Sequence, residues 1–230
     1  TAAALLPIWR EVLRDDALGP DTDFFDAGGR SLEAIQLVSR IRQACGVDLP
    51  SSVVFRYPTV RQLAALLDAG AAGHPAGSLV DVRAAGDRGR LFCVHPAPGT
   101  VLCYHELARH LPAGWAIHAL QARGLVRGQT PHRTVEEMAA DYVLEITRVQ
   151  PHGPYLLLGW STGGKVAHEV ARQLEAQGEP VALLVLVDTD PVFLPVSGRD
   201  FSSISLFVYS LKAMFTHGPV VRHHLDVASW

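Results

Sequence analysis

Apolar side chains in the first third of the chain recur at the spacing of a helix face, three and four positions apart. The first series is Leu5, Ile8, Trp9, Val12 and Leu13. The second is Leu32, Ile35, Val38, Ile41 and Cys45, followed by Gly46 as a stop signal. The third, capped by Thr59, is Val60, Leu63, Leu66 and Leu67. A short element is expected at 53–55. No strand pattern occurs, so the sequence predicts a small all-α bundle over residues 1–68.

The pattern changes after a stretch of small, nearly uncharged residues at 69–78, which is typical of a linker between domains. Beyond it, short apolar runs alternate with helical periodicity. The predicted strands are 91–94, 116–120, 155–158 and 181–187, and the predicted helices are 134–149 and 163–177. A run such as 181–187 is apolar throughout, which indicates a strand covered on both faces in a parallel sheet. The sequence therefore predicts an α/β domain over residues 79–230.

Composition narrows the classes of function. The 230 residues carry a formal net charge of −3, and Lys and Arg form no basic run, so we expect no nucleic-acid partner. No apolar stretch approaches the roughly 20 residues that span a bilayer, so no membrane association is expected. The three cysteines lack metal-ligand spacing, so we expect reduced thiols, no metal site and a cytoplasmic location.

Ser31 follows two glycines and begins the second predicted helix, in the stretch Asp-Phe-Phe-Asp-Ala-Gly-Gly-Arg-Ser-Leu at 23–32. The N–H groups and dipole of a helix N-terminus favour an anion, so a phosphodiester on the Ser31 hydroxyl would be stabilised there. The alternative is that Ser31 is only a helix N-cap, the commonest role of a serine at such a place.

This stretch, together with Phe-Arg-Tyr-Pro-Thr-Val at 55–60, resembles the phosphopantetheine attachment region of peptidyl carrier proteins. The resemblance covers residues 1–68. It implies 4'-phosphopantetheine bound covalently to Ser31 and loading by a phosphopantetheinyl transferase. Ala27 stands where the family usually has Leu, and Arg30 where it has His or Asp. A guanidinium can pair with a phosphate, so attachment is expected to survive the change at Arg30.

Ser161 lies in a second motif, Gly-Trp-Ser-Thr-Gly at 159–163, which directly follows one predicted strand and directly precedes a predicted helix. This strand–turn–helix context is what a G-x-S-x-G nucleophile elbow requires, whereas the five letters alone also describe a structural turn. A nucleophilic serine needs a base oriented by an acid. Asp188 directly follows the strand 181–187, and we favour it over Asp190 because it is nearer the strand end.

An oxyanion hole needs two hydrogen-bond donors near the nucleophile. The N–H of Thr162, the residue after Ser161, is one candidate. The other is the N–H of Ala97, in the loop that follows the strand 91–94. His95 begins this loop and could act as the base, but its place before Pro96 favours a role in shaping the loop.

The loop 92–99, the elbow and the stretch Leu-Val-Leu-Val-Asp-Thr at 184–189 resemble type I thioesterases of nonribosomal peptide and polyketide synthases. The resemblance implies an α/β-hydrolase domain over 79–230, with Ser161 as nucleophile and Asp188 as acid. It implies transfer of a peptidyl or acyl chain from the carrier to Ser161, followed by hydrolysis or macrocyclisation. The implied partners are upstream condensation and adenylation domains.

The family's general-base histidine follows a lid and further strands, and no histidine after Asp188 stands in that pattern. A helical lid is expected to begin at 201–215. His217, His223 and His224 come after it, and we assign none of them as the base. The domain is therefore expected to be C-terminally incomplete. The alternative function is a carrier with a degenerate thioesterase that binds or docks acyl chains without turnover. A lipase-like esterase fused to a carrier fits the motifs less well.

Overall fold

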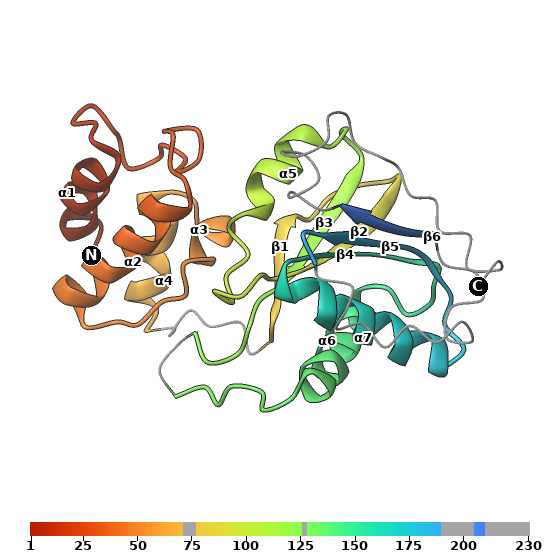
Figure 1. Ribbon diagram of the computed structural model, residues 1–230. Coiled ribbons are helices and arrows are strands. Elements are labelled where there is room, and N and C mark those ends of the chain that lie inside the picture. Colours follow the sequence, from red (N-terminus) through yellow and green to blue (C-terminus); the bar gives the residue numbers. More distant parts are fainter. Residues whose placement is uncertain (71–76, 126–127, 190–204, 210–230) are drawn as a thin grey trace. The chain divides into compact units, whose positions relative to one another are not determined.

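The computed structural model describes residues 1–70, 77–125, 128–189 and 205–209. The chain divides into two compact units, which Figure 1 shows in sequence colours. The main segment of the helical unit is Thr1–Gly77. The second unit contains Ser78–Arg123 together with the chain from Thr130 on. The small helical unit and the α/β unit confirm the fold class predicted from the sequence.

The described part of the helical unit has four helices: α1 (Ala2–Leu13), α2 (Ser31–Cys45), the single-turn α3 (Val53–Arg56) and α4 (Val60–Asp68). Its core is made by the apolar faces of these helices, and Leu5, Trp9, Leu37, Ile41 and Leu63 are fully buried. The Trp9 ring meets Phe24 edge to face, with centroids 5.9 Å apart. Thr59 caps α4 as predicted, because its side chain accepts a hydrogen bond from the Gln62 N–H.

The buried face of α2 differs from the prediction. The helix buries Ala34, Leu37 and Ile41, whereas Leu32 and Ile35 are 61% and 47% exposed. The predicted series of apolar residues and the observed buried series both have helical spacing, and both contain Ile41. The periodicity alone therefore does not distinguish between the two faces of α2. The small Ala34 side chain lies on the face that packs most closely, and this face was missed because alanine adds little to an apolar pattern.

In its described residues the α/β unit has six strands: β1 (Leu79–Arg83), β2 (Gly89–Val94), β3 (Trp115–Leu120), β4 (Tyr155–Trp160), β5 (Val181–Val187) and β6 (Ser205–Tyr209). Their order in the sheet is β1-β3-β2-β4-β5-β6. All neighbouring pairs are parallel except β1 with β3. The four strands predicted from apolar runs are confirmed, each within about two residues of its ends.

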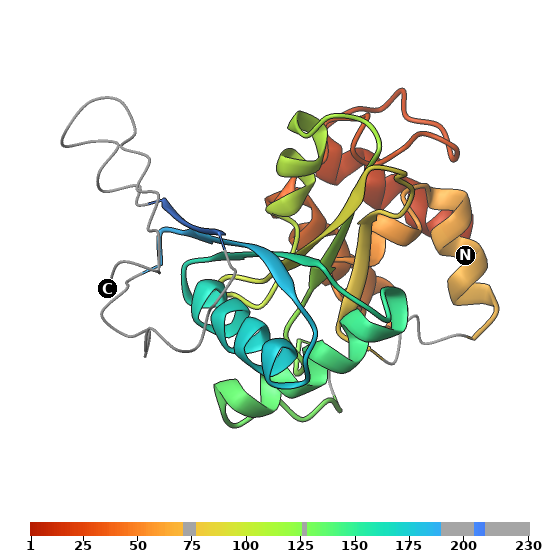
Figure 2. The same ribbon diagram turned by 90° about the vertical axis from the view of Figure 1, so that its right-hand side faces the viewer.

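Helices cover both faces of this sheet. Helices α6 (Val135–Val149) and α7 (Thr162–Ala176) pack together on one face, and the shorter α5 (Tyr104–His110) lies on the other (Figures 1 and 2). The main core is the layer between the sheet and the pair α6 and α7, where Phe92, Tyr142 and Tyr155 are fully buried. This covering explains the nearly continuous apolarity of the central strands.

The expectation of a helical lid at 201–215 is wrong for residues 205–209, which form strand β6 and pair in parallel with β5. An unpaired β5 edge would expose a row of backbone N–H and C=O groups, and β6 satisfies them. His217, His223 and His224 lie outside the described residues. In the part of the chain that the structure describes, no helix is both long and apolar enough to cross a membrane.

Candidate active site and carrier site

Ser161 occupies a sharp turn between the end of β4 at Trp160 and the start of α7 at Thr162. Its backbone has φ 55° and ψ −124°, a conformation that is strained for a residue with a side chain. Hydrogen bonds hold the turn in place. The Ser161 N–H donates to the carbonyl of Val187 over 2.7 Å, and the Ser161 carbonyl accepts from the Gly164 N–H over 3.0 Å. The side chain is partly exposed, as a nucleophile must be.

The glycines of the motif are required by close backbone contacts. A Cβ on Gly159 would lie 2.4 Å from the carbonyl oxygen of Gly163. A Cβ on Gly163 would lie 2.3 Å from the carbonyl oxygen of His95, and one on Gly164 would lie 1.9 Å from Thr189 Oγ1. Each distance is far inside van der Waals contact, so only glycine allows α7 to begin this close to β2 and β5.

Asp188 lies beside Ser161 at the carboxyl edge of the sheet. In the parallel pair β4 and β5, the last residues Trp160 and Val187 are in register, and Ser161 and Asp188 directly follow them. Asp188 is exposed and has φ 50°, again in the left-handed region. Asp190, the alternative acid, lies outside the described residues. The register therefore brings the serine and the favoured carboxylate together.

The loop 95–99, here called the oxyanion loop, begins next to the elbow, because Val94 of β2 is in register with Gly159 of β4. Ala97 and Thr162 are both exposed. Among the described residues, neither backbone N–H donates a hydrogen bond to another backbone or side-chain group. For Thr162 this is the ordinary state of a first-turn amide. Both N–H groups are therefore unpaired within the part of the chain that the structure describes.

His95 is buried and bonded within its own loop. Its Nδ1 lies 2.8 Å from the Pro96 carbonyl oxygen, and because a carbonyl only accepts, Nδ1 carries the proton. The ring meets Tyr142 edge to face at 6.1 Å. Burial lowers the pKa of His95, partly offset by the bond to Pro96. No hydrogen bond joins His95 to Ser161 in the described residues, in line with a loop-shaping role.

Sequence reasoning missed the role of Thr189. Its buried hydroxyl donates to the Ser161 carbonyl over 3.0 Å and lies 3.3 Å from the Val187 carbonyl, so it links the elbow to the end of β5. A lone threonine after a strand gives no such signal in the sequence. Within the described residues, no cluster of three His, Cys, Asp or Glu side chains could hold a metal ion, and the three cysteines form no disulfide.

Ser31 is the first residue of α2, and its side chain is exposed. Arg30 takes the N-cap position, so Ser31 is not the N-cap, and the Arg30 N–H donates to the Glu33 carboxylate over 3.2 Å. Gly28 before it has φ 86°, which suits a tight turn. Gly29 packs so closely that an added Cβ would lie 2.5 Å from the Phe24 carbonyl oxygen. An accessible hydroxyl beside first-turn amides fits a phosphodiester attachment.

Comparisons with known proteins identify a family for each of the two regions that contain these residues. The family model "Phosphopantetheine attachment site" matches residues 3–67, and the model "Thioesterase domain" matches residues 89–200. A "Dimodular nonribosomal peptide synthase" from Bacillus subtilis (strain 168) is 46% identical over 193 residues, which cover 84% of this chain and 8% of that protein. The "Malpinin synthetase" of Mortierella alpina is 42% identical over 198 residues, covering 85% of this chain and 3% of that protein.

Among solved structures, a four-domain nonribosomal peptide synthetase in its holo form, bound to AMP and glycine, matches with a TM-score of 0.52 and 32% identity. The match covers 85% of this chain and 15% of that chain. The chain thus spans less than a tenth of the length of the two curated relatives above.

The fold and the two matches define a carrier domain that bears covalently attached 4'-phosphopantetheine, followed by a thioesterase domain of the α/β-hydrolase type. The order of these domains and the relatives place the chain in a particular family. It belongs to the carrier–thioesterase didomains of nonribosomal peptide synthetases.

Proposed function

We propose that this chain releases a finished peptidyl or acyl chain from its carrier by transferring it to Ser161. The observation that carries the proposal is the strained elbow of Ser161 beside Asp188, at the carboxyl edge of two strands in register. Release follows by attack of water, which gives hydrolysis, or of an amine or hydroxyl within the chain, which gives macrocyclisation. The names of the Bacillus subtilis relative and of the four-domain synthetase support nonribosomal peptide biosynthesis as the setting.

In the proposed first step, Ser161 Oγ attacks the thioester carbonyl carbon while a base takes the hydroxyl proton. The negative charge that develops on the carbonyl oxygen is met by the N–H groups of Ala97 and Thr162. Collapse breaks the carbon–sulfur bond, the thiol leaves with the proton, and an ester to Ser161 remains. In the second step, water or an internal nucleophile attacks the ester and restores the serine hydroxyl. Asp188 orients the base and stabilises its protonated form.

We assign no base. Among the described residues, no histidine is hydrogen-bonded to Ser161 or to Asp188. The second candidate function is a degenerate thioesterase domain that binds or docks acyl chains without turnover. The two candidates differ in whether the Ser161 hydroxyl is activated.

For the carrier we propose residues 1–68, with a linker at 69–78 and the thioesterase domain at 79–230. Ser31 is the proposed attachment residue, loaded by a phosphopantetheinyl transferase. The attached group supplies a thiol that holds the acyl chain as a thioester. Upstream condensation and adenylation domains are the proposed partners that fill this thiol. The three unpaired cysteines support a cytoplasmic location.

A fluorophosphonate probe tests the nucleophile, because it reacts covalently only with an activated serine hydroxyl. We expect the full chain to be labelled once, and Ser161→Ala to abolish the labelling. Ser31→Ala serves as the matched control, since it removes a serine hydroxyl from the carrier and should leave labelling unchanged. Labelling that persists in Ser161→Ala would remove Ser161 as the nucleophile. A wild-type chain that never reacts would favour the docking module.

The attachment site has its own test. Incubation with coenzyme A and a phosphopantetheinyl transferase should add the mass of one phosphopantetheine group to the intact chain. The addition should vanish in Ser31→Ala and remain in Ser161→Ala. If the group is still added to Ser31→Ala, the attachment lies elsewhere.

A further inference from the structure

The oxyanion loop is tied at its far end to the segment that leaves β3. The Gly99 carbonyl accepts a hydrogen bond from the Ala122 N–H over 2.9 Å. Within the loop, the Gly99 N–H donates to the Pro96 carbonyl over 2.9 Å, which closes a turn around Ala97. The position of the Ala97 N–H therefore depends on where residues 121–123 are held.

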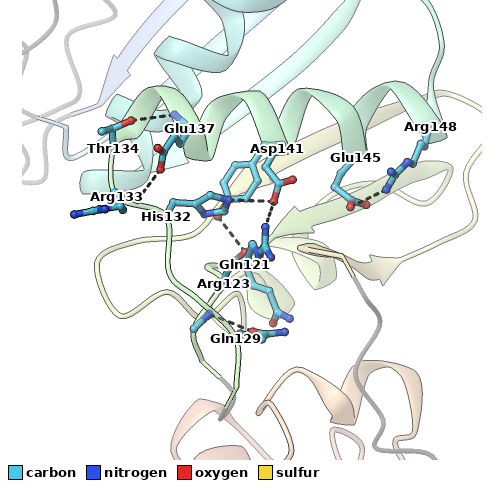
Figure 3. A network of polar contacts seen from close by, with 12 residues as sticks. Gln121, Arg123, Gln129, His132, Arg133, Thr134, Glu137, Asp141, Glu145 and Arg148 are labelled. Carbon is cyan, nitrogen blue, oxygen red and sulfur yellow. Dashed lines mark hydrogen bonds and ion pairs between the residues drawn. The ribbon is translucent and has the colours of Figure 1, made fainter.

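Helix α6 holds this segment through two neighbouring side chains. The hydroxyl of the fully buried Tyr142 donates to the Gln121 carbonyl over 3.0 Å. Burial, and secondly the charge of Asp141, raise the pKa of Tyr142, so the phenol keeps the proton that it donates. The Asp141 carboxylate lies 3.5 Å from the guanidinium of Arg123. Figure 3 shows the Asp141 side chain reaching from α6 toward Arg123 of this segment.

His132, which precedes α6, binds the same carboxylate: its Nε2 lies 3.1 Å from Asp141 Oδ2, and its side chain is only 8% exposed (Figure 3). The Tyr142 ring lies between two histidines, meeting His132 and His95 edge to face at 6.1 Å each. Since His95 is the first residue of the oxyanion loop, α6 contacts both ends of that loop, directly at His95 and through residues 121–123 at Gly99.

We propose that Asp141 and Tyr142 are positioning residues that fix the oxyanion loop, so that the Ala97 N–H is aimed before the substrate arrives. The proposal rests on the proposed function, in which Ala97 donates to the oxyanion. An oxyanion donor is effective only when it needs no reorganisation at the moment of reaction. The loop contains two prolines and has few hydrogen bonds of its own, so α6 supplies its rigidity from outside.

Hydrogen exchange of individual amides in the full chain, followed by NMR, tests the anchor without relying on activity. The amides to follow are Gly99 and Ala122, whose N–H groups make the two bonds described above. In Tyr142→Phe, which removes only the hydroxyl, we expect their exchange to become about two- to tenfold faster, the range expected for loss of one hydrogen bond. Asp141→Ala should act in the same direction and tests the second contact separately.

Glu145→Ala is the matched control. Glu145 lies one turn further along α6, and its carboxylate pairs with Arg148 over 3.0 Å (Figure 3). Neither side chain is ion-paired to Arg123, whose partner is Asp141. Exchange at Gly99 and Ala122 should not change in this variant. Core amides of β4 and β5 should keep their protection in all three variants. Unchanged exchange in both Tyr142→Phe and Asp141→Ala would overturn the proposal, as would a uniform rise throughout the sheet.

The labelling kinetics of Ser161 connect the anchor to chemistry. We expect the maximal rate of fluorophosphonate reaction to fall roughly tenfold in Tyr142→Phe and Asp141→Ala, with the half-saturating probe concentration unchanged, because only stabilisation of the transition state is lost. A normal maximal rate despite faster exchange would refute the catalytic part of the proposal. A wild-type chain that does not react refutes the proposed function instead, and the exchange data still decide whether α6 holds the loop.

Discussion

Arg83, at the end of β1, connects the sheet to the C-terminal end of α5. Its guanidinium donates four hydrogen bonds to backbone carbonyls. Nε donates to Trp115 over 2.6 Å, Nη1 to Ala108 over 2.8 Å and to Leu111 over 3.3 Å, and Nη2 to Pro112 over 3.1 Å. The last carbonyls of a helix have no partner within the helix, so Arg83 satisfies groups that the backbone cannot. Arg83→Met keeps most of the apolar stem and removes all four donors.

The expected cost follows from the number of bonds and their exposure. A hydrogen bond from a charged donor contributes about 1.5–3 kcal/mol when it is well buried. Arg83 is only half-buried, and water can reach some of the four carbonyls after the substitution. We therefore count about 0.5–1 kcal/mol per bond, or about 2–4 kcal/mol of the free energy of unfolding. For a unit of this size, that corresponds to a fall in Tm of roughly 5–15 °C.

Differential scanning calorimetry of the full chain measures this shift. Arg90→Met is the control, because Arg90 is an exposed residue of β2 whose guanidinium has no hydrogen-bond or ion-pair partner among the described residues. Surface changes of this kind usually alter stability by less than about 0.5 kcal/mol. If Arg83→Met lowered Tm no more than Arg90→Met, the four carbonyl contacts would contribute nothing to stability, and α5 would be held by its apolar packing alone.

Two further predictions concern the oxyanion loop. Gly163→Ala should lower the free energy of unfolding by about 1–3 kcal/mol and slow Ser161 labelling, because the new Cβ would lie 2.3 Å from the His95 carbonyl oxygen. An unchanged urea midpoint would contradict this. His95→Asn should flatten the pH dependence of stability. Burial lowers the pKa of His95 in the folded chain, so the unfolded chain binds the proton first, and stability falls as the pH drops below about 6.5. Urea midpoints between about pH 7.5 and 5 test this, and equal slopes in wild type and variant would refute it.

The central strands could be predicted from the sequence because burial on both faces of the sheet requires nearly continuous apolar residues. A strand between two helical layers must be apolar on both faces, and β4 and β5 show this as nearly unbroken apolar runs. The helices that cover them, α6 and α7, are long enough to repeat their apolar period several times. The parts of the fold that could be predicted from the sequence are therefore the long helices and the strands that are buried on both faces.

Elements at the margins of the sheet lack both properties. Strand β1 has five residues on an edge, and α5 has seven residues, fewer than two full turns of periodicity. Strand β6 was expected to be helical because a short apolar run such as 206–209 has no period that separates a strand from a buried helix. What places it in the sheet is the open edge of β5, a tertiary requirement that no local pattern contains.

The candidate site depends both on a local sequence motif and on contacts from segments that are distant in the sequence. The motif around Ser161 predicts a turn, but its geometry depends on contacts from distant segments: the Val187 carbonyl, the Thr189 hydroxyl and the backbone of His95. In the described part of the α/β unit, Ser161 and Asp188 are the only residues other than glycine with positive φ. Such strain persists only where the surrounding structure enforces it, and it is concentrated at functional sites. The two residues with this backbone conformation are the serine and the carboxylate that the sequence pattern had indicated, and their catalytic roles stay a prediction.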